Sequence, residues 1–300
     1  MRLLPSLKQL EYLDALARTG HFGRAAERCN VTPSTLSAGI RELEDLLGVA
    51  VAERTKRVVL ITDIGRELAA RAHGLLSGAE DLMAVAAAHR EPLAGDLKLG
   101  AIPTIGPFLL PDAVPALNAA FPKLRIYLRE HQTVDLLARL RAGELDLALI
   151  ALPWETDGLA VRPLFEDAFR FACHADHPLA GRRRITVDDL AAEPLLLLEE
   201  GHCLRGHALD ACRLTASALR GQFEATSLAT LVQMVAAGLG VTLLPELAIR
   251  AGITAGTDIR LVPLAQPATR QIGLVWRSAT PRGVAFEEIA TTLATLPASD

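Results

Sequence analysis

Two cysteines and their neighbours are the part of this sequence best suited to covalent chemistry. Cys203 follows His202, and Arg205 and His207 lie within the next few residues. A thiol reacts as its thiolate, and positively charged or hydrogen-bonding neighbours favour that form. Cys212 follows nine positions after Cys203, so the pair could support reversible thiol oxidation.

The alternative is that a cysteine serves as a small buried apolar residue, which is common in folded proteins. We interpret Cys29, in a predicted helical core, and Cys173, on a predicted core strand, in this way. For Cys203 and Cys212, both interpretations remain open on the residues alone. If residues 206–219 form a helix, Cys212 lies inside it and Cys203 precedes it, so a disulfide requires local rearrangement. Such a rearrangement is what a redox switch needs.

Other common chemistries lack their motifs. The four cysteines have no zinc-ligand spacing with each other or with histidine. There is no Walker loop, dinucleotide-binding glycine pattern or nucleophile elbow. We therefore expect neither a bound metal nor a cofactor.

Length and composition fit a chain of more than one globular domain, with 300 residues of which 50% are hydrophobic. The net charge is −4, and residues 1–62 carry only a small basic excess, which is a weak indication of phosphate binding. No uncharged apolar run reaches the roughly 18 residues of a membrane span. The N-terminal segment carries charges and no cleavage site, so we expect no signal peptide and a cytoplasmic location.

Three helices and a hairpin are predicted in the N-terminal part. A capping box begins at Ser6, a short helix covers 22–29, and Thr32 caps a third helix. Two β-prone runs, Val49–Val51 and Val58–Ile61, flank a basic tip. This pattern is typical of a winged helix-turn-helix, whose second helix enters the DNA major groove.

Hydroxyl and basic side chains sit where such a domain contacts DNA. The predicted contacts are Ser34, Thr35, Ser37 and Arg41 on the third helix and Arg54, Lys56 and Arg57 in the wing. The alternative is that the helices are merely amphipathic and that Ser and Thr at the helix start are caps.

A long helix separates two predicted domains. From about Asp63 to Ala88 there is no proline, and a narrow apolar stripe favours dimerisation. The pattern breaks at 89–95. We therefore predict a DNA-binding domain over 1–62, a linker helix and hinge over 63–90, and an α/β domain over 91–300.

Strands and helices alternate after the break, which predicts mostly parallel sheets. The predicted strands are 97–102, 125–129, 146–151, 169–174, 195–198, 241–244 and 271–276, and the predicted helices are 108–120, 133–142, 206–219, 227–237 and 284–296.

Several segments resemble one family closely. LKQLEYL at 7–13, GHFGRAA at 20–26, PSTLS at 33–37, IRELEDLLG at 40–48 and ERT at 53–55 resemble the N-terminal region of LysR-type transcriptional regulators. TSLATLVQMVAAGLGVTLLP at 226–245 resembles the sensor domain of that family. The resemblance implies a C-terminal α/β domain of two lobes, like a periplasmic binding protein, a homodimer through the linker helix, and a tetramer on DNA.

The likeness is greatest to peroxide-sensing members of the family. It is carried by LLLLEEGHCLR at 195–205 with the second cysteine at 212, AIPTIGPFLLP at 101–111, EHQTVDLLA at 130–138 and RQIGLVWR at 270–277. It implies that Cys203 is the peroxidatic cysteine and Cys212 the resolving one. It also implies a peroxide pocket lined by Thr104, Thr133, His202 and Arg270. Gly206-His207 and Asp210-Ala211 differ from the residues that better-known members have at these places. These differences bear on the rate of the reaction with peroxide and on the local refolding of the segment.

Taken singly, the pocket residues also have structural interpretations. Thr104 could cap a turn, Thr133 could cap its helix, and Arg270 could be a surface charge. With the resemblance, hydroxyls and a histidine orient hydrogen peroxide, and a guanidinium holds the cysteine as a thiolate.

The sequence therefore predicts a transcription factor, not an enzyme, whose partners are double-stranded promoter DNA, hydrogen peroxide, further copies of itself in a dimer or tetramer, and RNA polymerase. Two alternatives stay open. One is a regulator that binds a small metabolite between its lobes, and the other is a thiol peroxidase, for which a helix-turn-helix has no use.

Overall fold

The structure is a computed structural model of the 300-residue chain, and it describes residues 4–54, 59–88, 93–199, 204–206 and 224–296. The chain divides into two compact units, Met1–Ala87 and Ala88–Asp300. Within the described ranges, no helix has the length and hydropathy of a membrane span.

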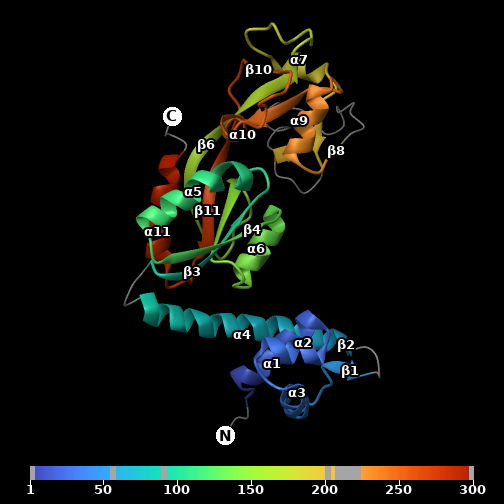
Figure 1. Cartoon of the computed structure of the whole chain (residues 1–300), viewed down its shortest axis with the longest axis vertical. Helices are drawn as coiled ribbons and strands as arrows, with labels where there is room; N and C mark the ends of the chain where they lie inside the picture. Colours follow the sequence, from blue (N-terminus) through green and yellow to red (C-terminus); the bar gives the residue numbers. More distant parts are fainter. Residues whose placement is uncertain (1–3, 55–58, 89–92, 200–203, 207–223, 297–300) are drawn as a thin grey trace. The chain divides into compact units, whose positions relative to one another are not determined.

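The first unit contains the predicted helix-turn-helix. Its elements are α1 (Leu7–Thr19), α2 (Phe22–Arg28), α3 (Pro33–Leu47), β1 (Ala52–Arg54), β2 (Val59–Ile61) and α4 (Asp63–Ala88) (Figure 1). The predicted caps are confirmed: Ser6 and Gln9 form a capping box, and the Thr32 side chain accepts the Thr35 N–H. Each cap satisfies backbone groups that a helix end leaves without partners.

The helices of this unit pack through small and branched apolar side chains. The most buried are Leu13, Leu16, Ala25, Ala26, Leu36, Ile40, Leu43 and Val51. Gly39 allows α3 to approach α1, because a Cβ atom there would lie 2.6 Å from Cδ2 of Tyr12. Two helices held this closely give α3 a fixed orientation within the unit.

The first strand of the wing begins later than predicted. Val51, expected in a strand, is fully buried, and its N–H donates to Oε1 of Glu44 at 2.8 Å. Since Val51 is tied to α3, pairing starts at Ala52, which lies opposite Ile61. The predicted strand Val49–Val51 is therefore wrong, while the second strand is confirmed to within one residue.

The second unit alternates strands and helices. Its first half comprises β3 (Gly95–Ala101), α5 (Gly106–Ala120), β4 (Leu124–Glu130), α6 (Thr133–Arg141), β5 (Leu147–Leu152) and β6 (Leu159–His174). Its second half comprises α7 (Val187–Ala191), β7 (Leu197–Leu198), β8 (Glu224–Ala225), α9 (Leu228–Ala236), β9 (Thr242–Pro245), α10 (Glu246–Arg250), β10 (Ile259–Pro263), β11 (Thr269–Arg277) and α11 (Gly283–Thr295). Residues 204–206 are helical, and the rest of the predicted helix 206–219 lies outside the described residues.

This unit has two lobes, each with its own apolar core, as the resemblance implied. One core gathers side chains from β3, α5, α6, β5 and α11, and the other from β7, α9, β9 and α10. β6 belongs to both, with Leu159 in the first core and Phe171 in the second (Figure 1). β11 pairs with β6 and packs in the first core, whereas Ala268, directly before β11, belongs to the second.

The expectation of mostly parallel sheets is wrong. β3 is parallel to β4 and β5, and β7 is parallel to β8, but β11 is antiparallel to both β5 and β6, and β6 is antiparallel to β9 and β10. One strand, β6, runs from the first lobe to the second, and β11 runs back in the opposite direction. Because these two strands pair with each other, antiparallel neighbours occupy the centre of the sheet.

Several short or irregular parts of this unit escaped prediction for local reasons. The predicted strand 169–174 is only the second half of β6, whose first half contains Pro163, Glu166 and Asp167 and so lacks clear alternation. Strand β10 and the one-turn helices α7 and α10 are too short for their periodicity to be recognised.

Candidate functional site

Thr104 and Thr133 follow neighbouring parallel strands. β3 and β4 pair in register, with Ala101 opposite Glu130, and each threonine comes three residues after its strand ends. The His131 N–H donates to the Ala101 carbonyl at 3.3 Å and links the two segments. The carboxyl ends of adjacent parallel strands meet at one edge of a sheet, where ligands commonly bind in α/β folds.

Both threonines are buried, at 2% and 1% exposure. Thr133 is not the cap of α6, because Gln132 occupies that position. Among the described residues the Thr133 hydroxyl has no hydrogen-bond partner. A buried hydroxyl without a partner is costly, so this group fits contact with a small polar ligand or water.

Arg270 is buried, which excludes its interpretation as a surface charge. Its side chain is 0% exposed and lies across from Asp167 on the paired strands β11 and β6. Nε donates to Oδ2 of Asp167 at 3.0 Å, and Nη2 lies 2.8 Å from the same oxygen. The opposite charge and these bonds offset the cost of burying a guanidinium.

The remaining guanidinium bonds go to Thr104. Nη1 of Arg270 donates to the Thr104 hydroxyl and Nη2 to its carbonyl, both at 2.9 Å. Because the Thr104 Oγ1 accepts from Arg270, its own hydrogen is left to donate to another group. The structure therefore brings Arg270 and Thr104 together in direct contact and places Thr133 at the same sheet edge.

Asp167 was not among the predicted site residues. It is 3% exposed, and its second oxygen, Oδ1, accepts the Leu247 N–H of α10 at 2.8 Å. The signal in the sequence was a pair of adjacent carboxylates, Glu166 and Asp167, in a largely apolar stretch that precedes Phe169.

The predicted redox residues His202, Cys203 and Cys212 lie outside the described residues. Directly after Cys203, Leu204 is buried in the core of the second lobe. Nη1 of Arg205 donates to the Leu198 carbonyl at 3.4 Å, so this arginine also holds backbone at the end of β7.

The two other cysteines match the interpretation as apolar residues. Cys173 is fully buried on β6, and burial raises the pKa of its thiol. Cys29 is half-buried, and burial followed by the Glu11 carboxylate raises its pKa as well. A raised pKa leaves less thiolate at neutral pH, so both thiols are poor nucleophiles.

The start of α3 presents the predicted DNA-contacting side chains. Ser34, Thr35 and Arg41 are exposed, and Ser37 is half-buried. The Thr32 hydroxyl lies 2.8 Å from the hydroxyls of both Ser34 and Thr35, so these groups also belong to the cap. In the wing, the backbone of Arg54 lies in β1, whereas Lys56, Arg57 and the Arg54 side chain are outside the description.

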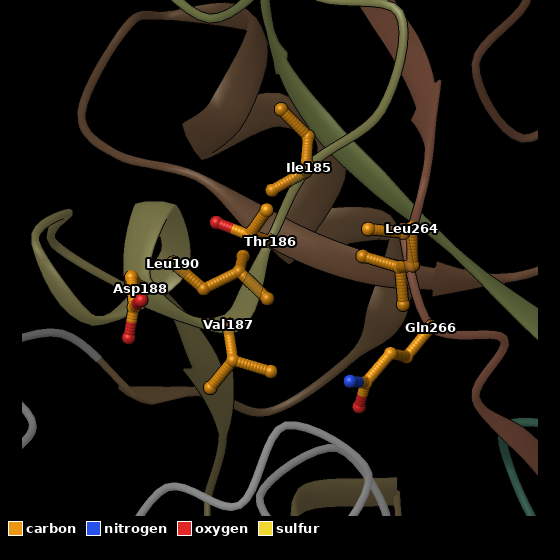
Figure 2. Close-up of a pocket in the computed structure, with 8 residues that line it drawn as sticks. Ile185, Thr186, Val187, Asp188, Leu190, Leu264 and Gln266 are labelled. Carbon is orange, nitrogen blue, oxygen red and sulfur yellow. The ribbon is translucent and has the colours of Figure 1, made fainter.

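Three of the cavities lined by described residues lie in the second unit. One of about 360 Å³ lies between α5, β6 and α10; Asp167 of the site lines it, and Asp112, Glu166 and Arg250 contribute further polar groups. A more open, largely apolar one of about 620 Å³ lies between α5 and the end of β4. The third, of about 180 Å³, lies between residues 185–190 on one side and Leu264 and Gln266 on the other (Figure 2). Within the described residues, no three His, Cys, Asp or Glu side chains gather as a metal ion would require.

Comparison with known families decides the class of this chain. Residues 7–66 match the profile described as "Bacterial regulatory helix-turn-helix protein, lysR family", and residues 90–296 match "LysR substrate binding domain". The chain belongs to the LysR family.

Individual relatives cover nearly the whole of this LysR-family chain. The "Hydrogen peroxide-inducible genes activator" of Dickeya chrysanthemi is 44% identical and covers 96% of this chain and 94% of its own length. The "HTH-type transcriptional regulator EstR" of Acinetobacter baylyi is 42% identical over 100% of this chain and 99% of its own.

A solved structure gives the same picture of the LysR-family fold. Full-length OxyR from Pseudomonas aeruginosa, as a single-residue variant, is 38% identical and superimposes with a TM-score of 0.79. It covers 97% of this chain and 95% of its own. The similar proteins of known role are thus transcriptional regulators.

Proposed function

We propose that this LysR-family chain senses hydrogen peroxide with Cys203 and Cys212 and adjusts transcription in response. The observation that carries the proposal is the buried cluster in which Arg270 leaves the Thr104 hydroxyl free to donate, near the unpartnered hydroxyl of Thr133. Two buried hydroxyls that can each bond a ligand suit a small polar molecule such as hydrogen peroxide. The several relatives named for hydrogen peroxide support the same assignment.

The proposed chemistry has two steps. The Cys203 thiolate attacks one oxygen of hydrogen peroxide, the O–O bond breaks, and the departing hydroxide takes a proton and leaves as water. The resulting sulfenic acid condenses with the Cys212 thiol, which forms the disulfide and releases a second water. His202 and the threonines orient the peroxide and stabilise the charge on the departing oxygen.

A thiol titration tests this proposal. One equivalent of peroxide should remove two thiols per chain, and peptide mass should map the new disulfide to Cys203 and Cys212. Cys203→Ser should abolish the reaction, whereas Cys212→Ser should react once and form no intramolecular disulfide. Cys29→Ser, a half-buried thiol with a raised pKa, is the matched control and should behave as the wild type.

A second candidate is regulation by a small metabolite. The cavity of about 360 Å³ between α5, β6 and α10 is large enough for one. Under this alternative, peroxide leaves the thiols and the DNA affinity unchanged, and the titration above separates the two.

The DNA-binding surface is proposed to be the start of α3 together with the wing. Arg41 reaches a base edge or phosphate one turn beyond Ser37, and Arg54, Lys56 and Arg57 contact the backbone or minor groove. We further propose that RNA polymerase is a partner on the promoter, because a regulator that activates must contact it or alter its access.

Self-association is proposed to use α4. Ile64, Leu75, Leu82 and Met83 are exposed along this helix at 41–69%. A helix with such a stripe is stabilised when a second copy covers it. Two dimers would then form the tetramer that the family resemblance implies.

A further inference from the structure

We propose that Asp167 is a positioning residue of the peroxide site, acting through Arg270 on the hydroxyl of Thr104. The inference rests on the proposed function, and it adds a residue that the sequence did not single out. Asp167 holds Arg270 by two nitrogens, Nε at 3.0 Å and Nη2 at 2.8 Å.

The orientation of the Asp167 carboxylate is itself fixed. Oδ1 accepts the Leu247 N–H of α10 and Oδ2 accepts from the arginine, so both oxygens are engaged and the carboxylate cannot turn without losing one of these bonds. With Nε and Nη2 held by one oxygen, the plane of the guanidinium is set, and Nη1 is directed to the Thr104 hydroxyl at 2.9 Å. Asp167 therefore decides where the guanidinium points.

The hydrogen-bonding roles follow from this orientation. A guanidinium only donates, so the Thr104 oxygen must accept and its hydrogen is available to the occupant of the site. If the guanidinium turned away, the Thr104 hydroxyl could satisfy itself by donating elsewhere in the protein. Asp167 thus keeps Thr104 as a hydrogen-bond donor.

The pairing also changes the role of Arg270. Asp167 neutralises its charge at close range and both side chains are almost completely buried. A paired guanidinium adds little net positive potential to a neighbouring thiol. Arg270 accordingly acts mainly by orienting Thr104, and not as the free cation that the sequence predicted for holding a thiolate.

The test uses full-length protein and compares two reactions of Cys203, oxidation by hydrogen peroxide and alkylation by iodoacetamide. Asp167→Asn should slow oxidation by about 10- to 100-fold, as expected when a donor is misplaced. Alkylation at the same pH should stay within about twofold, because iodoacetamide does not need the Thr104 hydrogen. If Asp167→Asn slows oxidation and alkylation by the same factor, Asp167 serves only to maintain the fold and is not a positioning residue.

Thr104→Val supplies the second arm. It removes the hydroxyl and should slow oxidation similarly, whereas Thr104→Ser should keep most of the rate. If Asp167 acts through Thr104, adding Asp167→Asn to Thr104→Val should cause no further loss. The proposal is overturned if Asp167→Asn reacts at the wild-type rate, or if its effect is the same in both backgrounds.

Two controls keep the outcome interpretable. Should Asp167→Asn not fold, Asp167→Asn combined with Arg270→Gln removes both charges and should still oxidise slowly and alkylate normally; a wild-type oxidation rate would overturn the proposal. The wild type and Cys203→Ser are measured first. If the wild type does not react, or if Cys203→Ser reacts as fast as the wild type, the proposed peroxide function fails. A wild-type oxidation rate in Asp167→Asn is a different outcome, which overturns only the role of Asp167.

Discussion

At the scale of single residues, the pair of Arg270 and Asp167 links the candidate site to the stability of the second unit. The two side chains are 0% and 2% exposed and face each other across β11 and β6. Such a pair adds little to the free energy of unfolding compared with an apolar pair of similar volume. Removing one member alone, however, leaves the other charged, buried and without a counter-charge.

We expect Arg270→Met to lower the free energy of unfolding by about 3–5 kcal/mol, because Asp167 loses its counter-charge. Unfolding in urea can be followed by the fluorescence of Trp154 and Trp276, which both belong to the second unit. The matched double variant, Arg270→Met with Asp167→Leu, should recover most of the loss. A loss below about 1 kcal/mol for Arg270→Met would contradict the buried pair.

A second prediction at this scale concerns the contribution of Arg41 to DNA binding. Arg41→Ala should weaken specific binding by about 1–3 kcal/mol, since an exposed arginine on the recognition helix can contact a base edge. Gel shifts at fixed salt measure the effect. Arg71→Ala is the control, because Arg71 is equally charged but pairs with Glu67 on α4; an unchanged affinity for Arg41→Ala would remove that residue from the interface.

At the scale of elements, the extent of α4 is explained by local sequence signals, whereas its exposed apolar side chains are not. The Asp63–Ala88 helix follows directly from the absence of proline and from its apolar stripe, and the structure confirms a helix over these residues. Its exposed leucines have no such local explanation. They fit the proposed contact of this helix with a second copy of the chain.

Leu82→Asp should therefore weaken self-association. Leu82 is 69% exposed, so the change costs the monomer little, but it places a charge in the proposed dimer contact. Sedimentation over a dilution series should show dissociation at higher concentration than in the wild type. Glu80→Lys, at another exposed position of α4, should have a smaller effect; if Leu82→Asp dissociates as the wild type does, the dimer contact lies elsewhere.

At the scale of the whole molecule, the second unit has the features of an independent domain. Both of its apolar cores are made from residues after position 92, and the first unit has a separate core. Separate cores allow separate folding.

A fragment of residues 91–300 should therefore fold, keep its reaction with peroxide and fail to bind DNA. Circular dichroism, the thiol titration and a gel shift check the three parts. The full-length chain at the same concentration is the control. A fragment that is insoluble or unfolded would place the boundary elsewhere.

The sequence by itself determined the local features of this protein. Helix starts at Ser6 and Thr32 depend on contacts three residues away, so residue types at short spacing predict them. The helix-turn-helix, the linker helix and most strands of the second unit follow from such signals and from periodicity. The threonines and Arg270 were identified by resemblance to a family, because their types alone fit caps and a surface charge equally well.

The tertiary structure alone decided how distant segments meet. Arg270 and Asp167 are 103 positions apart, and Arg270 and Thr104 are 166 apart. Their contact depends on β6 and β11 being antiparallel and on Arg270 lying opposite Asp167 in that register. Register and strand direction are set by packing across the whole lobe, which no short stretch of sequence records. For this reason the burial and pairing of Arg270, and with them the role of Asp167, follow from the register of β6 and β11 and not from the local sequence.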